Sequence, residues 1–294
     1  MTLLRTATLT LVVMLLLAGC TSIFNSTPAA TPTPTQPPPT PTPTPEPAAA
    51  ILNGERIPLA DFQDELIRLQ MALEAKGMTL TPQEQSQKVL DQMVDQLLLA
   101  QGAAEAGITV TDAELDERIQ ALTEEMGGGT ALADWQTKYH YSANSFRRLL
   151  RVSVLGMKMR DQIINGVPEE VEQIHARQIR VDDEAKIQSL YQNLLAGGEF
   201  ETLAFQEDPL TGGDLLWFPR GYLLQPAVEE AAFALQPGQF SAPVQTDIGW
   251  HIVYVVAREL HQLTPDARLA LQKKALQDWL EERRSQSTLE VTIP

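Results

Sequence analysis

The chain has 294 residues, 44% of them hydrophobic, and a formal net charge of −16. This length is enough for two modest domains, and so acidic a chain is a poor ligand for nucleic acid or an anionic membrane surface, so we expect no nucleic-acid partner. Cys20 is the only cysteine, which excludes an intramolecular disulfide and a thiolate metal site.

The first residues have the organisation of an export signal. Arg5 precedes an apolar run, Leu9 to Leu17, that is too short for a permanent membrane-spanning helix. Leu17-Ala18-Gly19-Cys20 resembles the lipobox of bacterial lipoproteins, which predicts a signal peptide at residues 1–19 and a lipid anchor on Cys20. The alternative is an ordinary secretory signal with a chance cysteine. Either way we expect an extracytoplasmic protein, lipid-anchored at the outer face of the bacterial cell membrane or periplasmic.

A segment rich in threonine and proline follows the signal. The two residue types alternate from Thr40 to Pro45, and almost nothing in the segment is apolar. Because such a composition cannot bury a core, residues 20–50 are predicted to be a disordered linker.

Residues 51–171 have the pattern of a helical domain. Asn53-Gly54 predicts a short strand and turn, and a helix with one apolar face follows from Asp61. Thr81-Pro82-Gln83-Glu84 and Thr111-Asp112-Ala113-Glu114 are capping-box patterns that begin two further helices. Three consecutive glycines precede another helical pair, the second running from Ser142 to Ile164.

The hydrophobic period changes after Val171. Strands are expected over 173–181 and 250–257, separated by helices over 182–196, 200–205 and 229–235. A last helix is expected over 266–284. We therefore predict a second domain at residues 172–260 and a C-terminal helix within 261–294.

Several motifs of the second domain occur in a characteristic order. His175 stands in Ile174-His175-Ala176-Arg177-Gln178, and His251 stands in Gly249-Trp250-His251-Ile252. Between them lie Gly212-Gly213-Asp214-Leu215, Glu229-Glu230-Ala231 and Pro237-Gly238. This order resembles the parvulin (PpiC, or rotamase) family of peptidyl-prolyl cis-trans isomerases. With the helical domain before it, the chain resembles the foldase chaperones of the SurA and PrsA type.

The resemblance implies a function and a set of site residues. It implies an isomerase, a parvulin-type enzyme without cofactor or metal, that acts on X-Pro bonds of unfolded or partly folded exported polypeptides. The two histidines would form a central pair, and Asp208 lies where parvulins place a cysteine or an acid. The implied proline pocket comprises Leu215, Phe218, Leu223 and Val228, with Gln178 beside it.

Two departures from the family pattern keep a second interpretation open. Gln178 occupies the region where many parvulins have a second histidine, and the usual pocket aromatic is replaced by Ala227 or Val228. These changes are compatible with a non-catalytic holdase chaperone whose degenerate parvulin module only binds peptides. The histidines would then be structural. A weaker alternative is a purely structural envelope protein, and an iron site of two histidines and a carboxylate is disfavoured because the ligand spacing is wrong.

The predicted fold class is α+β. We expect a helical chaperone-like domain and a parvulin domain, in which helices surround a small antiparallel sheet. The C-terminal helix is expected to pack back on the helical domain.

Overall fold

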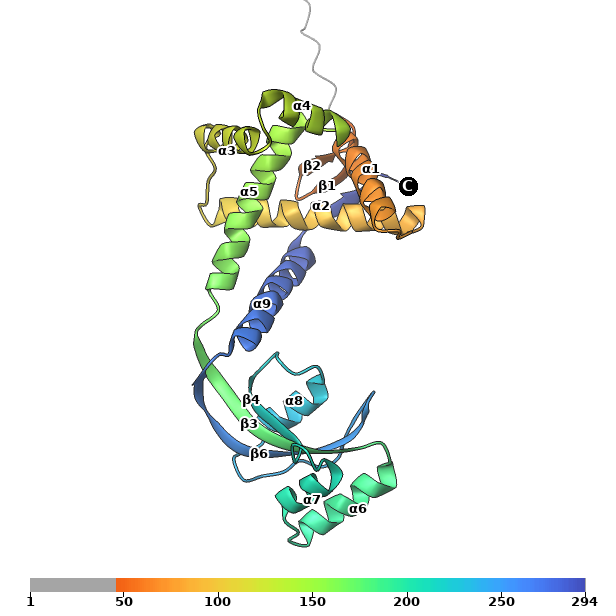
Figure 1. Cartoon of the computed structure of the whole chain (residues 1–294), viewed down its shortest axis with the longest axis vertical. Helices are drawn as coiled ribbons and strands as arrows, with labels where there is room; N and C mark the ends of the chain where they lie inside the picture. Colours follow the sequence, from red (N-terminus) through yellow and green to blue (C-terminus); the bar gives the residue numbers. More distant parts are fainter. Residues whose placement is uncertain (1–45, 294) are drawn as a thin grey trace, which may run out of the picture. The chain divides into compact units, whose positions relative to one another are not determined.

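The computed structural model of the chain describes residues 46–293. Its first part contains a short hairpin and five helices (Figure 1). The elements of this part are β1 (Ala48–Leu52), β2 (Glu55–Pro58), α1 (Leu59–Ala75), α2 (Pro82–Glu105), α3 (Asp112–Glu125), α4 (Gly129–Lys138) and α5 (Ala143–Asn165).

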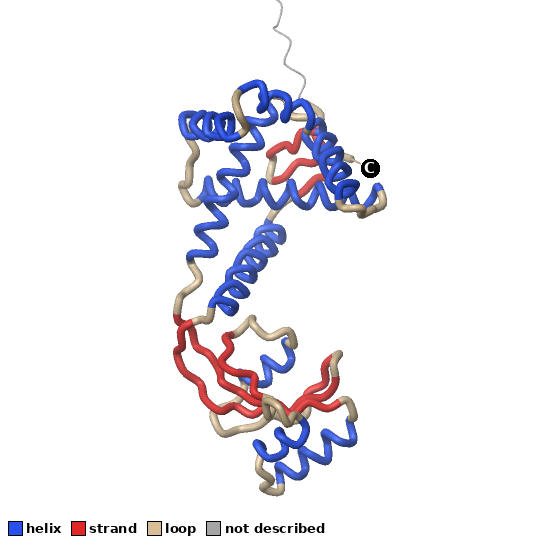
Figure 2. Tube along the Cα trace, viewed as in Figure 1, coloured by secondary structure: helices blue, strands red, loops and turns tan. Residues whose placement is uncertain are grey.

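The second part contains both strands and helices and ends in a long helix and a short strand (Figure 2). Its elements are β3 (Glu170–Val181), α6 (Glu184–Leu195), α7 (Phe200–Glu207), β4 (Asp214–Pro219), α8 (Pro226–Phe233), β5 (Val244–Thr246), β6 (Gly249–Gln262), α9 (Pro265–Gln286) and β7 (Leu289–Val291). The α+β prediction is confirmed.

Local sequence signals account for most helix starts. At α2, the Thr81 side chain accepts from the Glu84 N–H at 3.3 Å, and the Glu84 carboxylate accepts from the Thr81 N–H at 2.7 Å, which completes the predicted capping box. At α3 only half of the box forms. Thr111 accepts from the Glu114 N–H, but the Glu114 carboxylate binds Lys158 at 3.0 Å instead.

A three-stranded sheet in the order β2-β1-β7 joins the two ends of the described chain. Asn53 and Gly54 form the hairpin turn with φ values of 52° and 85°, as a type I′ turn requires. The predicted end of the disordered linker at residue 50 is wrong, because Ala48–Ala50 belong to β1. Ala49 and Ala50 are fully buried, and their small side chains let the strand lie directly under the helices. Residues 1–45, with Cys20 and most of the predicted linker, lie outside the described residues.

The C-terminal helix packs on the helical part, as predicted. Trp279 and Leu280 of α9 pack on the cluster formed by β1, α1 and α2, whose members include Leu52, Phe62 and Val94. Arg284 donates to Asp95 at 2.7 Å and to Asp91 at 3.2 Å, both on α2. Apolar packing and charge thus fix α9 to α2 together.

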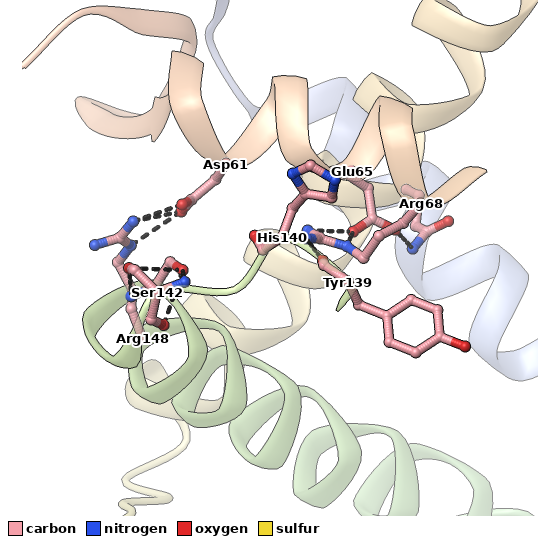
Figure 3. A network of polar contacts seen from close by, with 9 residues as sticks. Asp61, Glu65, Arg68, Tyr139, His140, Ser142 and Arg148 are labelled. Atoms are coloured by element: carbon pink, nitrogen blue, oxygen red, sulfur yellow. Dashed lines mark hydrogen bonds and ion pairs between the residues drawn. The ribbon is translucent and has the colours of Figure 1, made fainter. Parts of the chain in front are cut away.

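A polar network connects α1 with the start of α5 (Figure 3). The Asp61 side chain is only 3% exposed, and it accepts hydrogen bonds of 2.6 to 3.0 Å from the Arg148 guanidinium. Nearby, Arg68 binds Glu65 at 2.7 Å and donates to the Tyr139 carbonyl at 3.1 Å. These contacts tie α1 to the α4–α5 connection.

The second sheet is antiparallel, in the order β4-β3-β6-β5. One face packs against α8 through a cluster that includes Ile174, Ala176, Val253 and Val255. The other face packs against α6 and α7 through a cluster that includes Ile179 and Ile252. Since successive side chains of a strand point to opposite faces, these two clusters define the faces of residues 174–181 of β3 and 251–255 of β6.

A bulge interrupts the pairing of β3 with β4. His175 pairs with Trp217 and Arg177 with Asp214, so that two β4 residues, Leu215 and Leu216, oppose one residue of β3. Leu216 has a φ of 58°, a left-handed conformation that glycine adopts without strain. The Leu216 side chain is 67% exposed.

Candidate functional site

Gln178 and His251 meet on the face of the sheet that α8 covers. Gln178 lies two residues after Ala176 on β3, and His251 lies two residues before Val253 on β6, so both side chains share that face. The His251 ring is 1% exposed, and its Nδ1 lies 2.9 Å from the Gln178 Oε1. The two strands therefore present one amide–imidazole pair to this face.

The hydrogen bonds of His251 define its tautomer. An amide oxygen only accepts, so Nδ1 carries the proton that is donated to Gln178. Nε2 then accepts from the Thr246 hydroxyl, 2.9 Å away on β5. Burial lowers the pKa of His251 below its ordinary value, and the positive charge of Arg180 lowers it further. His251 is therefore a neutral, oriented imidazole at pH 7.

The predicted pairing of the two histidines is wrong. His175 lies between Ile174 and Ala176 on β3, so its side chain points to the opposite face from theirs and from His251. Its Nε2 lies 2.9 Å from the Asp214 Oδ1, and its ring contacts Trp217 at a centroid distance of 5.5 Å. The side chain that meets His251 is that of Gln178.

The Asp208 carboxylate accepts hydrogen bonds from the loop that follows it. At the C-terminal end of α7 its carboxylate accepts from the Leu210 N–H at 3.1 Å, from the Thr211 N–H at 3.3 Å and from the Thr211 hydroxyl. The Thr211 hydroxyl and the Thr211 N–H, in that order, are the main causes that lower the pKa of Asp208. The carboxylate also accepts from the Gly213 N–H at 3.4 Å, and the Gly213 carbonyl accepts from the Gln178 N–H at 2.8 Å. Asp208 thus reaches the amide–imidazole pair only through the backbone.

A cleft of 520 Å³ opens beside this pair. It is lined by Gln178, Leu215, Tyr222, Leu223, Leu224, Gln225, Val228, Ile248, His251 and Ala270. No Asp, Glu, Lys or Arg is among these residues. The cleft is therefore an apolar surface in which the polar side-chain groups come from two amides, one imidazole and one phenol.

Five of the predicted residues line this cleft: His251, Gln178, Leu215, Leu223 and Val228. His175, Asp208 and Phe218 do not. Phe218 is fully buried beneath the cleft, where its ring meets Phe233 of α8 edge-to-face at 6.0 Å. It supports the floor and has no exposed surface for a ligand.

The rim that carries Leu223 is held by one carboxylate. Glu229, in the first turn of α8, accepts from the N–H groups of Gly221 at 2.6 Å and of Tyr222 and Leu223 at 3.0 Å. Three hydrogen bonds to one charged group fix the loop before any ligand arrives. The sequence showed Glu229 as part of a motif but did not indicate this role.

Five lining residues were missed by the sequence analysis: Tyr222, Leu224, Gln225, Ile248 and Ala270. Leu224 is 95% exposed and Ile248 45% exposed, and only their exposure as large apolar side chains marks them. Ala270 belongs to α9, outside the parvulin segment, and no local signal connects it with the cleft. In residues 46–293 no group of three or more His, Cys, Asp or Glu side chains is placed to hold a metal ion.

Comparisons with known proteins agree with these two parts. Residues 168–257 match the model of the PPIC-type PPIASE domain, and residues 40–150 match that of the SurA-like N-terminal domain. The foldase protein PrsA of Caldanaerobacter subterraneus subsp. tengcongensis is 32% identical over 226 residues, which cover 69% of this chain and 71% of the relative.

Relatives of a second kind are chaperones. The chaperone SurA of Methylobacillus flagellatus is 36% identical over 148 residues, 43% of this chain and 34% of the relative. Among solved structures, a PrsA from Bacillus cereus is similar with a TM-score of 0.44 and 22% identity, and the match covers 79% of this chain and 84% of that chain. Within residues 46–293, no helix is both long and apolar enough to cross a membrane.

Proposed function

Because this chain belongs to the PrsA family of foldases, we propose that it isomerises X-Pro bonds of exported polypeptides in the cleft beside His251 and Gln178. The observation that carries this proposal is a neutral imidazole, hydrogen-bonded to an amide, at the edge of an uncharged apolar cleft. The helical part, which matches the SurA-like N-terminal domain, is the proposed holder of the unfolded chain.

Such a site suits the reaction because rotation about an X-Pro bond requires no nucleophile. The barrier of about 20 kcal/mol is mostly lost amide resonance, and an apolar surrounding favours the twisted, less polar amide over the planar one. Leu215, Leu223 and Val228 would grip the proline ring. This mechanism needs neither cofactor nor metal.

Gln178 would supply the polar contact to the substrate. Its Oε1 is engaged by His251, and its Nε2 makes no hydrogen bond within residues 46–293. That amide N–H is the natural donor to a substrate carbonyl beside the rotating bond. His251 and Thr246 would hold the amide in this orientation, and Asp208 would act indirectly by fixing Gly213 against β3.

The test is an isomerase assay with a proline tetrapeptide and with proline-limited refolding of a small protein. We expect the chain from residue 20 onward, with Cys20→Ser to remove lipidation, to accelerate both. His251→Ala should lower kcat/KM by about tenfold or more, a usual effect of losing a positioned polar group.

His175→Ala is the matched control for His251→Ala, since His175 is a strand histidine on the opposite face of the same sheet. It should leave kcat/KM within about twofold. Equal losses in the two variants would contradict the assignment of the site to the cleft.

A non-catalytic holdase is the second candidate function. The observation that favours it is that the hydrogen-bond partner of His251 is Gln178, an amide that does not titrate. A holdase would suppress aggregation of an unfolded client while leaving the slow refolding phase unchanged, in the unsubstituted chain and in His251→Ala alike. Catalysis by the unsubstituted chain excludes it.

The anchor is a separate part of the proposal. Leu17-Ala18-Gly19-Cys20 supports cleavage before Cys20 and attachment of lipid to its thiol, which would hold the foldase at the outer face of the membrane. A Cys20→Ser variant expressed in a bacterial host should lose incorporation of a labelled fatty acid and leave the membrane fraction. Retention of the variant at the membrane would contradict lipid anchoring through this residue.

A further inference from the structure

One lining residue of the cleft comes from outside the segment that matches the PPIC-type domain. That segment ends at residue 257, whereas Ala270 lies in the second turn of α9. Ala267, which is 1% exposed, precedes it on the same helix face, and Leu271 and Lys274 follow at helical spacing. The inner face of α9 is therefore turned toward the cleft rim.

The contact between α9 and the rim is close. A Cβ atom at Gly221 would lie 2.7 Å from the Lys274 Cδ and 3.6 Å from the Leu271 Cδ2. Gly221 also has a φ of 81°, and Glu229 holds its N–H. The loop at Gly221 is thus held by Glu229 and also contacts α9. The distance between this loop and α9 is therefore set by the fold.

The other end of α9 is fixed on the helical part. A Cβ atom at Gly102 of α2 would lie 2.6 Å from the Trp279 ring, so the indole and the α2 backbone are in direct contact. Arg284 adds its two ion pairs to α2. The helix that contributes Ala270 to the cleft is thus positioned by residues of the chaperone-like part.

From these contacts we propose that α9 is a wall of the isomerase cleft and that Ala270 determines which residue beside the proline is accepted. The inference rests on the proposed function of the cleft. The small side chain leaves space in a cleft that Leu224, Ile248 and the ring of Tyr222 also line, and none of the lining residues is charged. This space suits a bulky apolar side chain beside the proline, such as phenylalanine or leucine.

The test compares Ala270→Trp with Leu269→Trp in the chain from residue 20 with Cys20→Ser. Leu269 is the adjacent residue of α9, is 50% exposed and does not line the cleft, so it controls for placing tryptophan in this helix. We expect Ala270→Trp to raise KM about tenfold or more for a Phe-Pro tetrapeptide, and less than about threefold for an Ala-Pro tetrapeptide, with kcat unchanged. Leu269→Trp should change neither.

The difference between the two substrates separates a specificity wall from a structural effect. If Ala270 only supported the fold, Ala270→Trp would change kcat and KM to the same extent for both substrates, and that result would overturn the proposal. Equal KM values in the unsubstituted chain and in both variants would also overturn it. If the unsubstituted chain catalyses nothing, the proposed isomerase function fails instead. Binding of the Phe-Pro peptide, measured by NMR titration, then still tests the wall, because Ala270→Trp must weaken it selectively.

Discussion

Replacing Gly213 by alanine will destabilise the protein by about 3 kcal/mol or more, because the new methyl group has no place to go. Its Cβ would lie 1.8 Å from the Gln178 carbonyl oxygen, a backbone atom that cannot rotate away. Gly213 also has a φ of 65°, and its carbonyl accepts from the Gln178 N–H at 2.8 Å. Backbone strain and the loss of this hydrogen bond therefore both contribute to the lower free energy of unfolding. Urea unfolding at pH 7 measures the change.

Gly238→Ala is the matched control. Gly238 belongs to the same domain and has a φ of 85°, but no atom lies within 4 Å of its added Cβ. It should cost only about 1 kcal/mol, the ordinary penalty of a left-handed alanine. Equal losses at the two positions would show that the approach of Gly213 to β3 is unimportant. We also expect Gly213→Ala to lower isomerase activity at temperatures where it remains folded, since it displaces Gln178.

The second large effect is expected at the buried ion pair between α1 and α5. Arg148→Met should cost about 2–3 kcal/mol, because it leaves the Asp61 carboxylate, 3% exposed, without its charge partner. The value lies below the range for a fully buried pair because the Arg148 side chain is 43% exposed and water screens the interaction. Thermal and urea unfolding check the prediction.

Arg160→Met on the same helix provides the control. Arg160 forms an ion pair with Asp161 at 3.5 Å in which both side chains are about half exposed, so its loss should change stability by less than about 0.5 kcal/mol. In the double variant Asp61→Asn with Arg148→Met, the loss of unfolding free energy should be about 1 kcal/mol smaller than the sum of the losses in the two single variants. The reason is that a neutral amide costs less to bury without a partner than a carboxylate does. Additive losses would contradict a direct pair.

The sequence predicted the elements of this fold well where the signal is local. Thr81-Pro82 begins α2, Asn53-Gly54 turns the first hairpin, and the change of period after Val171 marks β3. Each of these depends on a few neighbouring residues. Ala48–Ala50 were assigned to the linker with the segment rich in threonine and proline that precedes them, and only pairing with β2 and β7 reveals their strand.

The candidate site was predictable in part. His251, Leu215 and Leu223 line the cleft as predicted. His175 was predicted to pair with His251, but it lies on the opposite face of the sheet. Parity alone excludes a shared face for His175 and Gln178, since they are three residues apart on one strand. The bulge at Leu216 and the contribution of Ala270 from α9 to the cleft could not be predicted from the sequence, because both depend on contacts between segments far apart in the chain.

The pairing of β1 with β7 has a consequence for export. Leu52 pairs with Leu289 and Ala50 with Val291, so the last residues of the chain complete the sheet that the first described residues begin. If the polypeptide is exported N-terminus first, β1 keeps one unpaired edge until β7 emerges. The sheet β4-β3-β6-β5 is built from one contiguous segment, which does not depend on β7. We therefore expect the segment from β3 to β6 to mature before the sheet of the chaperone-like part.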